Sequence, residues 1–353
     1  AGATAREMLI AAAAATWDVP AEECKARDHA VHHAATGRSA GFGDLVDAAS
    51  KLEPPADATF KSREDYRYIG KAMDTIDGFA FTTGTATYGI DAALPDMLYA
   101  SIERCPAHGG KVVSFDATAA KAVAGVVDVV KLPEPTSPPL FNLLGGVAVL
   151  ASNTWAAQRG REALDIEWDR GANGAHESDA YREALLASVS APGAPVLTRG
   201  DAAAAFDSAQ RTHEAIYYAP YLSQAPMEPP AALAHMTDDG GCEIWACTQN
   251  PQAAQDTVAG TLGIEKDQVK VHVTLLGGGF GRKSKPDYIA EAAWLARETG
   301  RPVKVTWTRE DDIRHGYLHS VSAQFLKAGI DADGGATSLL HRTCFPSIGS
   351  TFD

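Results

Sequence analysis

The sequence predicts an α+β fold organised in more than one domain, and three observations lead to this prediction. The chain has 353 residues, enough for two or three domains with cores of their own. Residues 58–170 are rich in the alternating patterns typical of strands, and residues 242–307 alternate between strand and helix patterns. The apolar fraction of 45% and the charged fraction of 22% are those of an ordinary soluble globular protein.

Residues 1–57 are expected to form a helix, a short hairpin and a second helix, ending at the break "EPPAD". The apolar run over 8–15 is far shorter than the roughly 20 residues that a membrane-spanning helix needs. Thr4 and Glu7 stand before it in the spacing of a capping box. This pattern favours a structural helix over a signal peptide.

Three histidines, His29, His32 and His33, fall in the predicted hairpin. A metal site is one interpretation, but no carboxylate or cysteine cluster accompanies them, so solvated imidazoles are expected. The five cysteines of the chain are scattered without a C-x-x-C pair. Neither a zinc site nor an iron–sulfur cluster held by this chain alone is therefore predicted.

The middle of the chain, residues 58–170, is predicted to be a β-rich domain with one main helix. Strand patterns cover 85–102, 109–116, 126–132, 145–152 and 164–168, and the helix covers 155–163. The continuous apolar run of 145–152 predicts a strand that is buried on both faces. The polar stretch 169–179 marks the next boundary, and the last domain then covers 180–353.

The last domain carries the clearest helix signals. Asn250 caps a helix that has Pro251 at its first position and Gly263 just past its end. The other expected elements are strands over 242–248, 269–276 and 302–307, a helix over 287–299, a capping box at Thr308 and Asp311, and a hairpin over 320–345.

The formal net charge of −14 makes nucleic acid and anionic membranes unlikely partners, because a uniformly acidic surface repels both. A site for an anion must then be a local concentration of basic side chains and backbone N–H groups.

The stretch "LLGGGFGRKSKPDY" (275–288) has this character. It lies between a predicted strand and a predicted helix, where glycine lets backbone N–H groups approach an anion and the helix adds its positive end. We expect the cofactor-binding or anion-binding residues of this loop to be Gly277, Gly278, Gly279, Phe280, Gly281 and Arg282. The alternative is that the glycines form only a turn. A dinucleotide-binding fingerprint and a P-loop both fit the spacing poorly.

Two further stretches stand out near this loop in the sequence. In "QAPMEPPAALA" (224–234) the prolines fix an extended path around Met227 and Glu228. In "CTQNPQ" (247–252), Gln249 stands at a strand end just before a helix cap, a place where side chains commonly face a ligand. The alternative for Gln249 is a side chain that bonds its own turn.

Taken together these stretches resemble the molybdopterin-binding large subunit of the xanthine dehydrogenase and aldehyde oxidase family. The matching residues are "QAPMEPPAALA", "WACTQNPQAAQDTVAGTLGI", "VKVHVTLLGGGFGRK" and "GRPVKVTWTREDD", in this order over 217–312. Upstream, 66–116 and 145–169 resemble the α/β-hammerhead domain of the family. Residues 1–52 resemble a unit that most members carry after the cofactor domain. This altered order resembles the isoquinoline 1-oxidoreductase β-subunit branch.

The resemblance implies the fold in more detail: an α/β-hammerhead domain followed by a mixed α/β molybdenum-cofactor-binding domain. The cofactor would be molybdopterin cytosine dinucleotide with molybdenum. The reaction would oxidise an aldehyde or an N-heteroaromatic carbon, with water supplying the oxygen. Electrons would leave through 2Fe-2S clusters on a small partner subunit, with a cytochrome c subunit as a further partner. The branch also favours a bacterial periplasmic or membrane-associated location over a cytoplasmic one.

The resemblance also implies roles for individual residues. Gln249 matches the glutamine that hydrogen-bonds an oxygen ligand of molybdenum, and Gly278–Gly281 match the loop that contacts the cofactor. Ser284 stands where some purine-oxidising members carry glutamate, which argues against purine recognition. The base glutamate of the family comes from a C-terminal segment that this chain does not contain, and Glu228 is expected to be structural. The isolated chain is therefore expected to be inactive, and a cofactor-free binding module is the alternative function.

Overall fold

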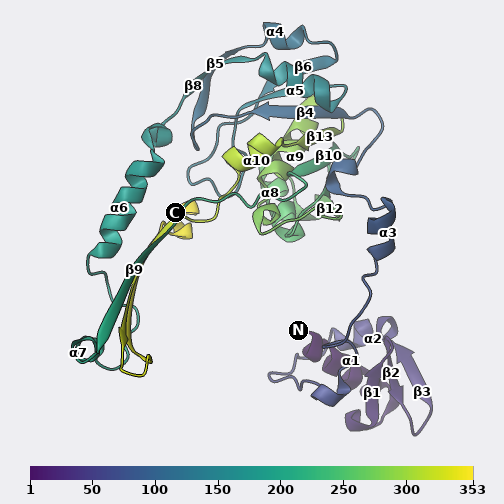
Figure 1. Cartoon of the computed structure of the whole chain (residues 1–353). Coiled ribbons are helices and arrows are strands. Elements are labelled where there is room, and N and C mark those ends of the chain that lie inside the picture. The colour runs from purple at the N-terminus through teal and green to yellow at the C-terminus, as the bar shows by residue number, and fades with distance from the viewer. Residues whose placement is uncertain (353) are drawn as a thin grey trace. The chain divides into compact units, whose positions relative to one another are not determined.

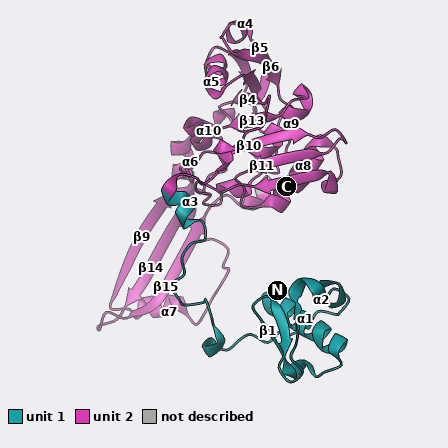
Figure 2. Cartoon of the chain, turned by 90° about the vertical axis from the view of Figure 1, so that its right-hand side faces the viewer, with its two compact units in different colours: residues 1–82 teal, residues 83–353 magenta. Residues whose placement is uncertain are grey.

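The computed structural model describes residues 1–352, and they divide into two compact units, residues 1–82 and residues 83–352 (Figure 2). Each unit has hydrophobic cores of its own. The domain ranges 1–57, 58–170 and 180–353 remain a prediction.

The first unit contains helix α1 (Gly2–Trp17), an antiparallel sheet of β1 (Cys24–Arg27), β2 (Ala30–His33) and β3 (Arg38–Gly41), and helix α2 (Phe42–Ala49). The predicted order of helix, hairpin and helix is thus present, with a third strand added. The predicted capping box does not form, because α1 begins at Gly2 and Thr4 lies inside it. Glu7 instead accepts a hydrogen bond from the Thr59 N–H at 2.7 Å.

The expectation of solvated imidazoles holds for His29 and His32, which are exposed, but is wrong for His33. His33 is buried, and its ring nitrogens bond the Thr36 hydroxyl at 2.7 Å and the Glu23 carboxylate at 2.8 Å. His32 bonds the backbone carbonyl of Arg27 at 3.2 Å. Within residues 1–352, no three histidine, cysteine or acidic side chains gather in a way that could hold a metal ion.

The second unit is built on a seven-stranded mixed sheet in the order β12-β11-β10-β13-β4-β7-β6 (Figure 1). The strands are β4 (Leu98–Glu103), β6 (Val126–Lys131), β7 (Val147–Ala151), β10 (Ala231–Met236), β11 (Cys242–Ala246), β12 (Val269–Val273) and β13 (Val303–Thr306). Strands from the predicted middle domain and from the predicted last domain therefore share one sheet, joined where β13 pairs with β4 in parallel. Every residue of β7 is buried, as its apolar run predicts.

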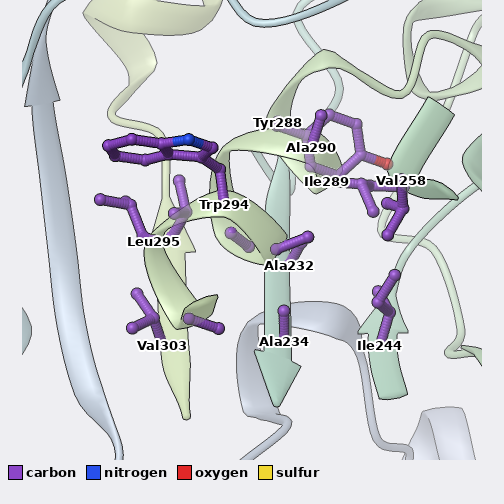
Figure 3. Close-up of a cluster of buried hydrophobic side chains, with 14 of the residues drawn as sticks. Ala232, Ala234, Ile244, Val258, Tyr288, Ile289, Ala290, Trp294, Leu295 and Val303 are labelled. Atoms are coloured by element: carbon purple, nitrogen blue, oxygen red, sulfur yellow. The ribbon is translucent and has the colours of Figure 1, made fainter. Parts of the chain in front are cut away.

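Helices α8 (Pro251–Leu262) and α9 (Asp287–Thr299) pack against the main sheet and form its largest core (Figure 3). Helix α9 is buried from Asp287 to Ala296. Alanines make this close packing possible, because Ala232 and Ala234 on β10 face a helix that is itself rich in alanine.

The predicted boundaries of α8 and α9 are confirmed. The Asn250 side chain accepts a hydrogen bond from the Ala253 N–H, and Gly263 ends α8 in the left-handed conformation. The predicted strand over 85–102 is mostly wrong, because only Leu98–Glu103 is extended in a sheet. The residues before it form a short 3-10 helix, η3 (Gly89–Asp91), and turns.

The remaining elements are not part of the main sheet. They are α3 (Gly78–Thr83), the pair β5 (Lys111–Asp116) and β8 (Asp165–Asp169), α4 (Thr118–Lys121), α5 (Thr154–Glu162), α6 (Ser178–Ser190), α7 (Ala202–Asp207), the sheet of β9 (Arg211–Ala219), β14 (Ser322–Ile330) and β15 (Ala336–Cys344), η6 (Arg282–Ser284) and α10 (Arg309–His315). The predicted hairpin over 320–345 is β14 and β15, and the predicted capping box of Thr308 and Asp311 begins α10. None of the described helices is long and apolar enough to cross a bilayer.

Candidate functional site

A cleft of about 680 Å³ opens in the second unit beside the glycine loop. Its walls come from three segments that are far apart in the sequence: η3 and its flanks, the proline-rich stretch before β10, and the loop after β12. The lining residues are Tyr88, Ile90, Asp91, Met227, Glu228, Pro229, Leu276, Gly277, Gly278 and Phe280.

The glycine loop presents unused backbone donors. Among the residues that the structure describes, the N–H groups of Gly278, Gly279 and Phe280 have no hydrogen-bond partner. Gly278, Phe280 and Gly281 have φ values of 95°, 50° and 90°, so the chain turns sharply where these donors lie. The Phe280 ring is 67% exposed. Three consecutive free N–H groups suit an anionic oxygen.

Close neighbours also require the glycines. A Cβ atom added at Gly277 would lie 2.5 Å from the Glu228 Cβ, and one at Gly279 would lie 2.5 Å from the amide carbon and oxygen of Gln249. Both distances are shorter than real Cβ contacts, so Glu228 would have to shift at its Cβ atom in the first case and the Gln249 amide in the second. The loop therefore packs between Glu228 and Gln249, and this packing is a reason for glycine that the sequence analysis did not foresee.

Gln249 follows β11 and contacts the loop at Gly279 and Gly281. Its side-chain oxygen accepts the Gly281 N–H at 3.0 Å, and its backbone N–H donates to the Lys283 carbonyl at 3.0 Å. The residue is exposed, and its side-chain amide nitrogen has no hydrogen-bond partner in the part of the chain that the structure describes. The side chain is thus fixed at its oxygen and offers two N–H donors at its tip.

Glu228 joins two walls of the cleft. One carboxylate oxygen accepts the Ile90 N–H at 3.0 Å, and the other accepts the Gly277 N–H at 2.9 Å and the Lys283 ammonium at 2.6 Å. Burial raises the pKa of Glu228, but these hydrogen bonds and the Lys283 charge outweigh burial and leave the pKa below its usual value. A carboxylate held this firmly in its ionised form is structural, as the sequence predicts.

Lys304 was not identified from the sequence, whereas Lys283 was expected to add its charge to the anion-binding loop together with Arg282, and this expectation is wrong. Lys283 is fully buried against Glu228. Lys304 projects from β13 and donates to the carbonyls of Ile90 and Ala92, which holds η3 in place. Burial lowers the pKa of Lys304. The signal for Lys304 in the sequence was a lysine in the middle of an apolar strand, because a lysine is rarely buried there without a partner.

The side chain of Arg282 does not face the cleft, which corrects the expectation that its charge attracts a ligand. It is 1% exposed, and its two terminal nitrogens each donate to an Asp287 oxygen at 2.8 Å. The guanidinium also lies 4.9 Å from the Trp307 ring centre. Burial alone would lower the pKa of Arg282, but the Asp287 charge raises it above the usual value. Arg282 is an internal ion-pair residue because Asp287 begins α9 directly behind it.

The predicted site residues thus fall into three groups. Gly277, Gly278 and Phe280 line the cleft, and Gly279, Gly281 and Gln249 adjoin them through direct contacts. Only Arg282 lies apart. The free N–H groups of the loop and the free amide of Gln249 are donors without acceptors, and therefore fit a ligand that carries several acceptor oxygens, such as a pterin with phosphate groups.

Comparisons with known proteins identify a family for this part of the chain. The molybdopterin cofactor-binding domain family matches residues 189–347. Isoquinoline 1-oxidoreductase subunit beta of Brevundimonas diminuta is 31% identical over 97% of this chain and 48% of its own length. A membrane-bound aldehyde dehydrogenase of Gluconacetobacter polyoxogenes, whose name includes pyrroloquinoline quinone, is 32% identical over 96% of this chain and 44% of its own length.

Solved structures share the fold. The aldehyde oxidoreductase of Desulfovibrio gigas superposes with a TM-score of 0.60 at 21% identity, over 86% of this chain and 38% of the other. The chain spans about half the length of the curated relatives it matches. Residues 189–347 thus belong to the molybdopterin cofactor-binding domain family, and the chain is similar to subunits of bacterial isoquinoline and aldehyde oxidoreductases.

Proposed function

We propose that this chain is the cofactor-holding part of a molybdenum-dependent hydroxylase that oxidises an aldehyde or an N-heteroaromatic carbon. When bound, the molybdopterin group, in the cytosine dinucleotide form, supplies the redox chemistry, with water as the oxygen source. In this proposal residues 58–170 form the hammerhead-like domain and 180–353 the first part of the cofactor domain. Electrons pass to a small 2Fe-2S subunit, with a cytochrome c subunit as a further partner, at a periplasmic or membrane-associated site in bacteria.

The observation that carries the proposal is the set of unused donors beside Gln249. The N–H groups of Gly278, Gly279 and Phe280 bind anionic or carbonyl oxygens of the group, and the sharp turn brings the backbone close to it. Gln249 donates from its free amide nitrogen, while the Gly281 N–H fixes its oxygen and so fixes the direction of donation. A donor held before the ligand arrives needs no reorganisation when charge develops on the acceptor.

The other residues of the cleft hold the bound group in position and take no part in the reaction. Glu228 stays ionised and bonded to Lys283 and Gly277, so it does not take up a proton from a substrate. Phe280 and Met227, which are 67% and 89% exposed, give the cleft apolar edges that can exclude water from a bound planar group. None of these residues is proposed as the general base.

Metal and pterin analysis of the full-length protein, produced together with its partner subunit, tests the proposal. We expect about one molybdenum and one pterin per chain. Because one relative is named for pyrroloquinoline quinone, the same extract is assayed for that quinone. Quinone without molybdenum, or neither group, would contradict the proposal, and finding neither group would support the alternative of a cofactor-free binding module.

A further inference from the structure

Three charged residues, Arg309, Asp312 and Arg282, connect the two walls of the cleft, and we call this group the strap. The cleft depends on the distance between the glycine loop and the segment Pro226–Met227, and these two walls meet directly at only a few atoms. The Glu228 N–H donates to the Gly277 carbonyl at 3.0 Å, and the Gly277 N–H donates to the Glu228 carboxylate at 2.9 Å. These bonds join the walls at residues 228 and 277, and Pro226 packs against Gly278, but none of these contacts engages the carbonyl groups of Pro226 and Met227.

That segment has little backbone support of its own. Pro226 lacks an N–H group, and two more prolines follow Glu228, so a regular strand cannot form here. Ala225, just before it, has a φ of 41°, which is strained for a residue with a side chain. Gln224 is anchored by the hydrogen bond from its side-chain amide to the Tyr317 carbonyl at 2.8 Å, and the carbonyl groups of Pro226 and Met227 then need partners of their own.

Arg309 is the partner of both carbonyl groups. One terminal nitrogen of its guanidinium donates to the carbonyls of Pro226 and Met227, the latter at 3.1 Å. The other donates to an Asp312 carboxylate oxygen at 2.8 Å, one turn along α10. The planar fork of arginine suits this double task, because it can bind a carboxylate and two carbonyls in a fixed relative geometry.

Asp312 connects this strap to the glycine loop. It is 1% exposed, and its second oxygen lies 4.0 Å from the Arg282 side-chain Nε atom. Arg282 directly follows Gly281, and its other nitrogens bond Asp287 at the start of α9. Arg309, Asp312 and Arg282 therefore form a series of charges between the two walls, in which Arg309 hydrogen-bonds Asp312 and Asp312 attracts Arg282 across 4.0 Å without a hydrogen bond.

We propose that Arg309 is a positioning residue, which sets the spacing of the two cleft walls by holding Pro226–Met227 to Asp312 and, through Arg282, to the glycine loop. The inference rests on the proposed function only for the identity of the ligand in the cleft. Arg309 itself is about one third exposed, with 35% of its side-chain surface accessible, so replacing it does not open a buried cavity.

The test is amide hydrogen exchange of the full chain without cofactor, read at residue level by mass spectrometry. In Arg309→Met we expect exchange at the Glu228 and Gly277 amides to accelerate on the order of tenfold, the loss typical of one charge-assisted hydrogen bond. Leu233 in β10 is the internal reference and should not change. Arg309→Lys should fall between, because an ammonium group can bind the carbonyls or Asp312 but lacks the fork.

Arg314→Met is the matched control, since Arg314 lies on the same helix and, among the described residues, bonds neither Pro226 nor Met227. Unchanged exchange at Glu228 and Gly277 in Arg309→Met would overturn the inference, and so would an equal acceleration at Leu233.

A second readout is the rate at which bound pterin leaves the loaded protein, which should rise in Arg309→Met and be partly restored in Arg309→Lys. If the wild-type protein carries no pterin, the proposed function is wrong. The exchange result still tests whether Arg309 sets the spacing of the two cleft walls.

Discussion

Gln249 shows how a single side chain can be fixed and still offer a free donor. Its oxygen accepts the Gly281 N–H at 3.0 Å, and its amide nitrogen has no hydrogen-bond partner among the described residues. The sequence analysis identified the residue from its position after a strand, and the structure adds the partner that orients it. The alternative of a side chain that bonds its own turn does not describe it, because Gly281 lies on another loop.

Replacement of Gln249 by alanine should therefore leave the fold intact and impair turnover. We expect kcat of the full-length enzyme to fall about 100-fold, the loss typical of one preorganised donor at a charged acceptor. Molybdenum content and thermal stability are measured alongside. Gln252→Ala is the control, since Gln252 is exposed on α8 and bonds only Gln255 and Asp256. If Gln249→Ala and the wild type have equal turnover at equal molybdenum content, Gln249 serves only to pack against the loop.

Arg282 is the residue for which sequence reasoning and structure differ most. A cation beside a glycine loop suggests anion binding, but the sequence does not reveal that Asp287, five residues on, reaches back to pair with it. Burial of an arginine depends on tertiary partners such as Trp307 and Asp312, which lie 25 residues or more downstream in the sequence. A local motif cannot predict such a pairing.

Arg282→Gln should accordingly destabilise the fold rather than weaken ligand binding alone. Removing one partner of a buried ion pair costs about 3–5 kcal/mol in the free energy of unfolding, because Asp287 is left buried and unpaired. Denaturant unfolding measures this directly. Arg159→Gln removes an exposed arginine and should change little. A loss for Arg282→Gln no larger than that of the control would show that the buried pair is not needed.

At the scale of elements, the glycine loop is a close-packed turn between β12 and α9 with Glu228 on one side and Gln249 on the other. The helices on either side of the β12–loop unit were predicted well, because Asn250, Pro251, Gly263 and Gly300 mark their ends in the sequence itself. The cleft was not predictable in this way, since its walls come from residues 88–91, 227–229 and 276–280.

Gly279→Ala tests the packing role of the loop. The added Cβ would lie 2.5 Å from the Gln249 amide, so Gln249 must move and its donor loses its direction. We expect a loss of turnover similar to that of Gln249→Ala, measured as kcat at equal molybdenum content. Gly260→Ala on α8 is the control, because its Cβ would meet nothing within 4 Å, and it should stabilise the helix by about 1 kcal/mol. Full turnover in Gly279→Ala would contradict the packing argument.

Glu228 should make the stability of this region dependent on pH. Its folded-state pKa lies below the usual value of 4.5, so its contribution is complete above that pH and is lost as the pH falls through the folded-state pKa. The destabilisation caused by Glu228→Gln, measured by denaturant unfolding, should therefore shrink between about pH 6 and about pH 3. A constant difference over this range would mean that Glu228 is not ionised in the fold.

At the scale of the whole molecule, one sheet contains strands from two of the predicted domains. β13 pairs with β4, and Arg104 at the end of β4 bonds Glu291 on α9 at 3.0 Å and 2.6 Å. The α+β class and the family could be predicted from the sequence, because the motifs over 217–312 are local. The long-range joining of β4 to β13 could not, because strand pairing leaves no periodic signal in a single sequence.

The proposed function requires that the glycine loop holds the cofactor. The most direct measurement is the molybdenum content of Gly278→Val against wild type, both as full-length protein with the partner subunit. Gly278 has a φ of 95°, and an added Cβ would lie 3.1 Å from the Phe280 ring and 3.2 Å from Pro226, so valine must distort the loop. We predict a content below about a tenth of wild type with the circular dichroism spectrum retained. A folded variant that loads molybdenum at the wild-type level would contradict the account and place the cofactor contacts elsewhere.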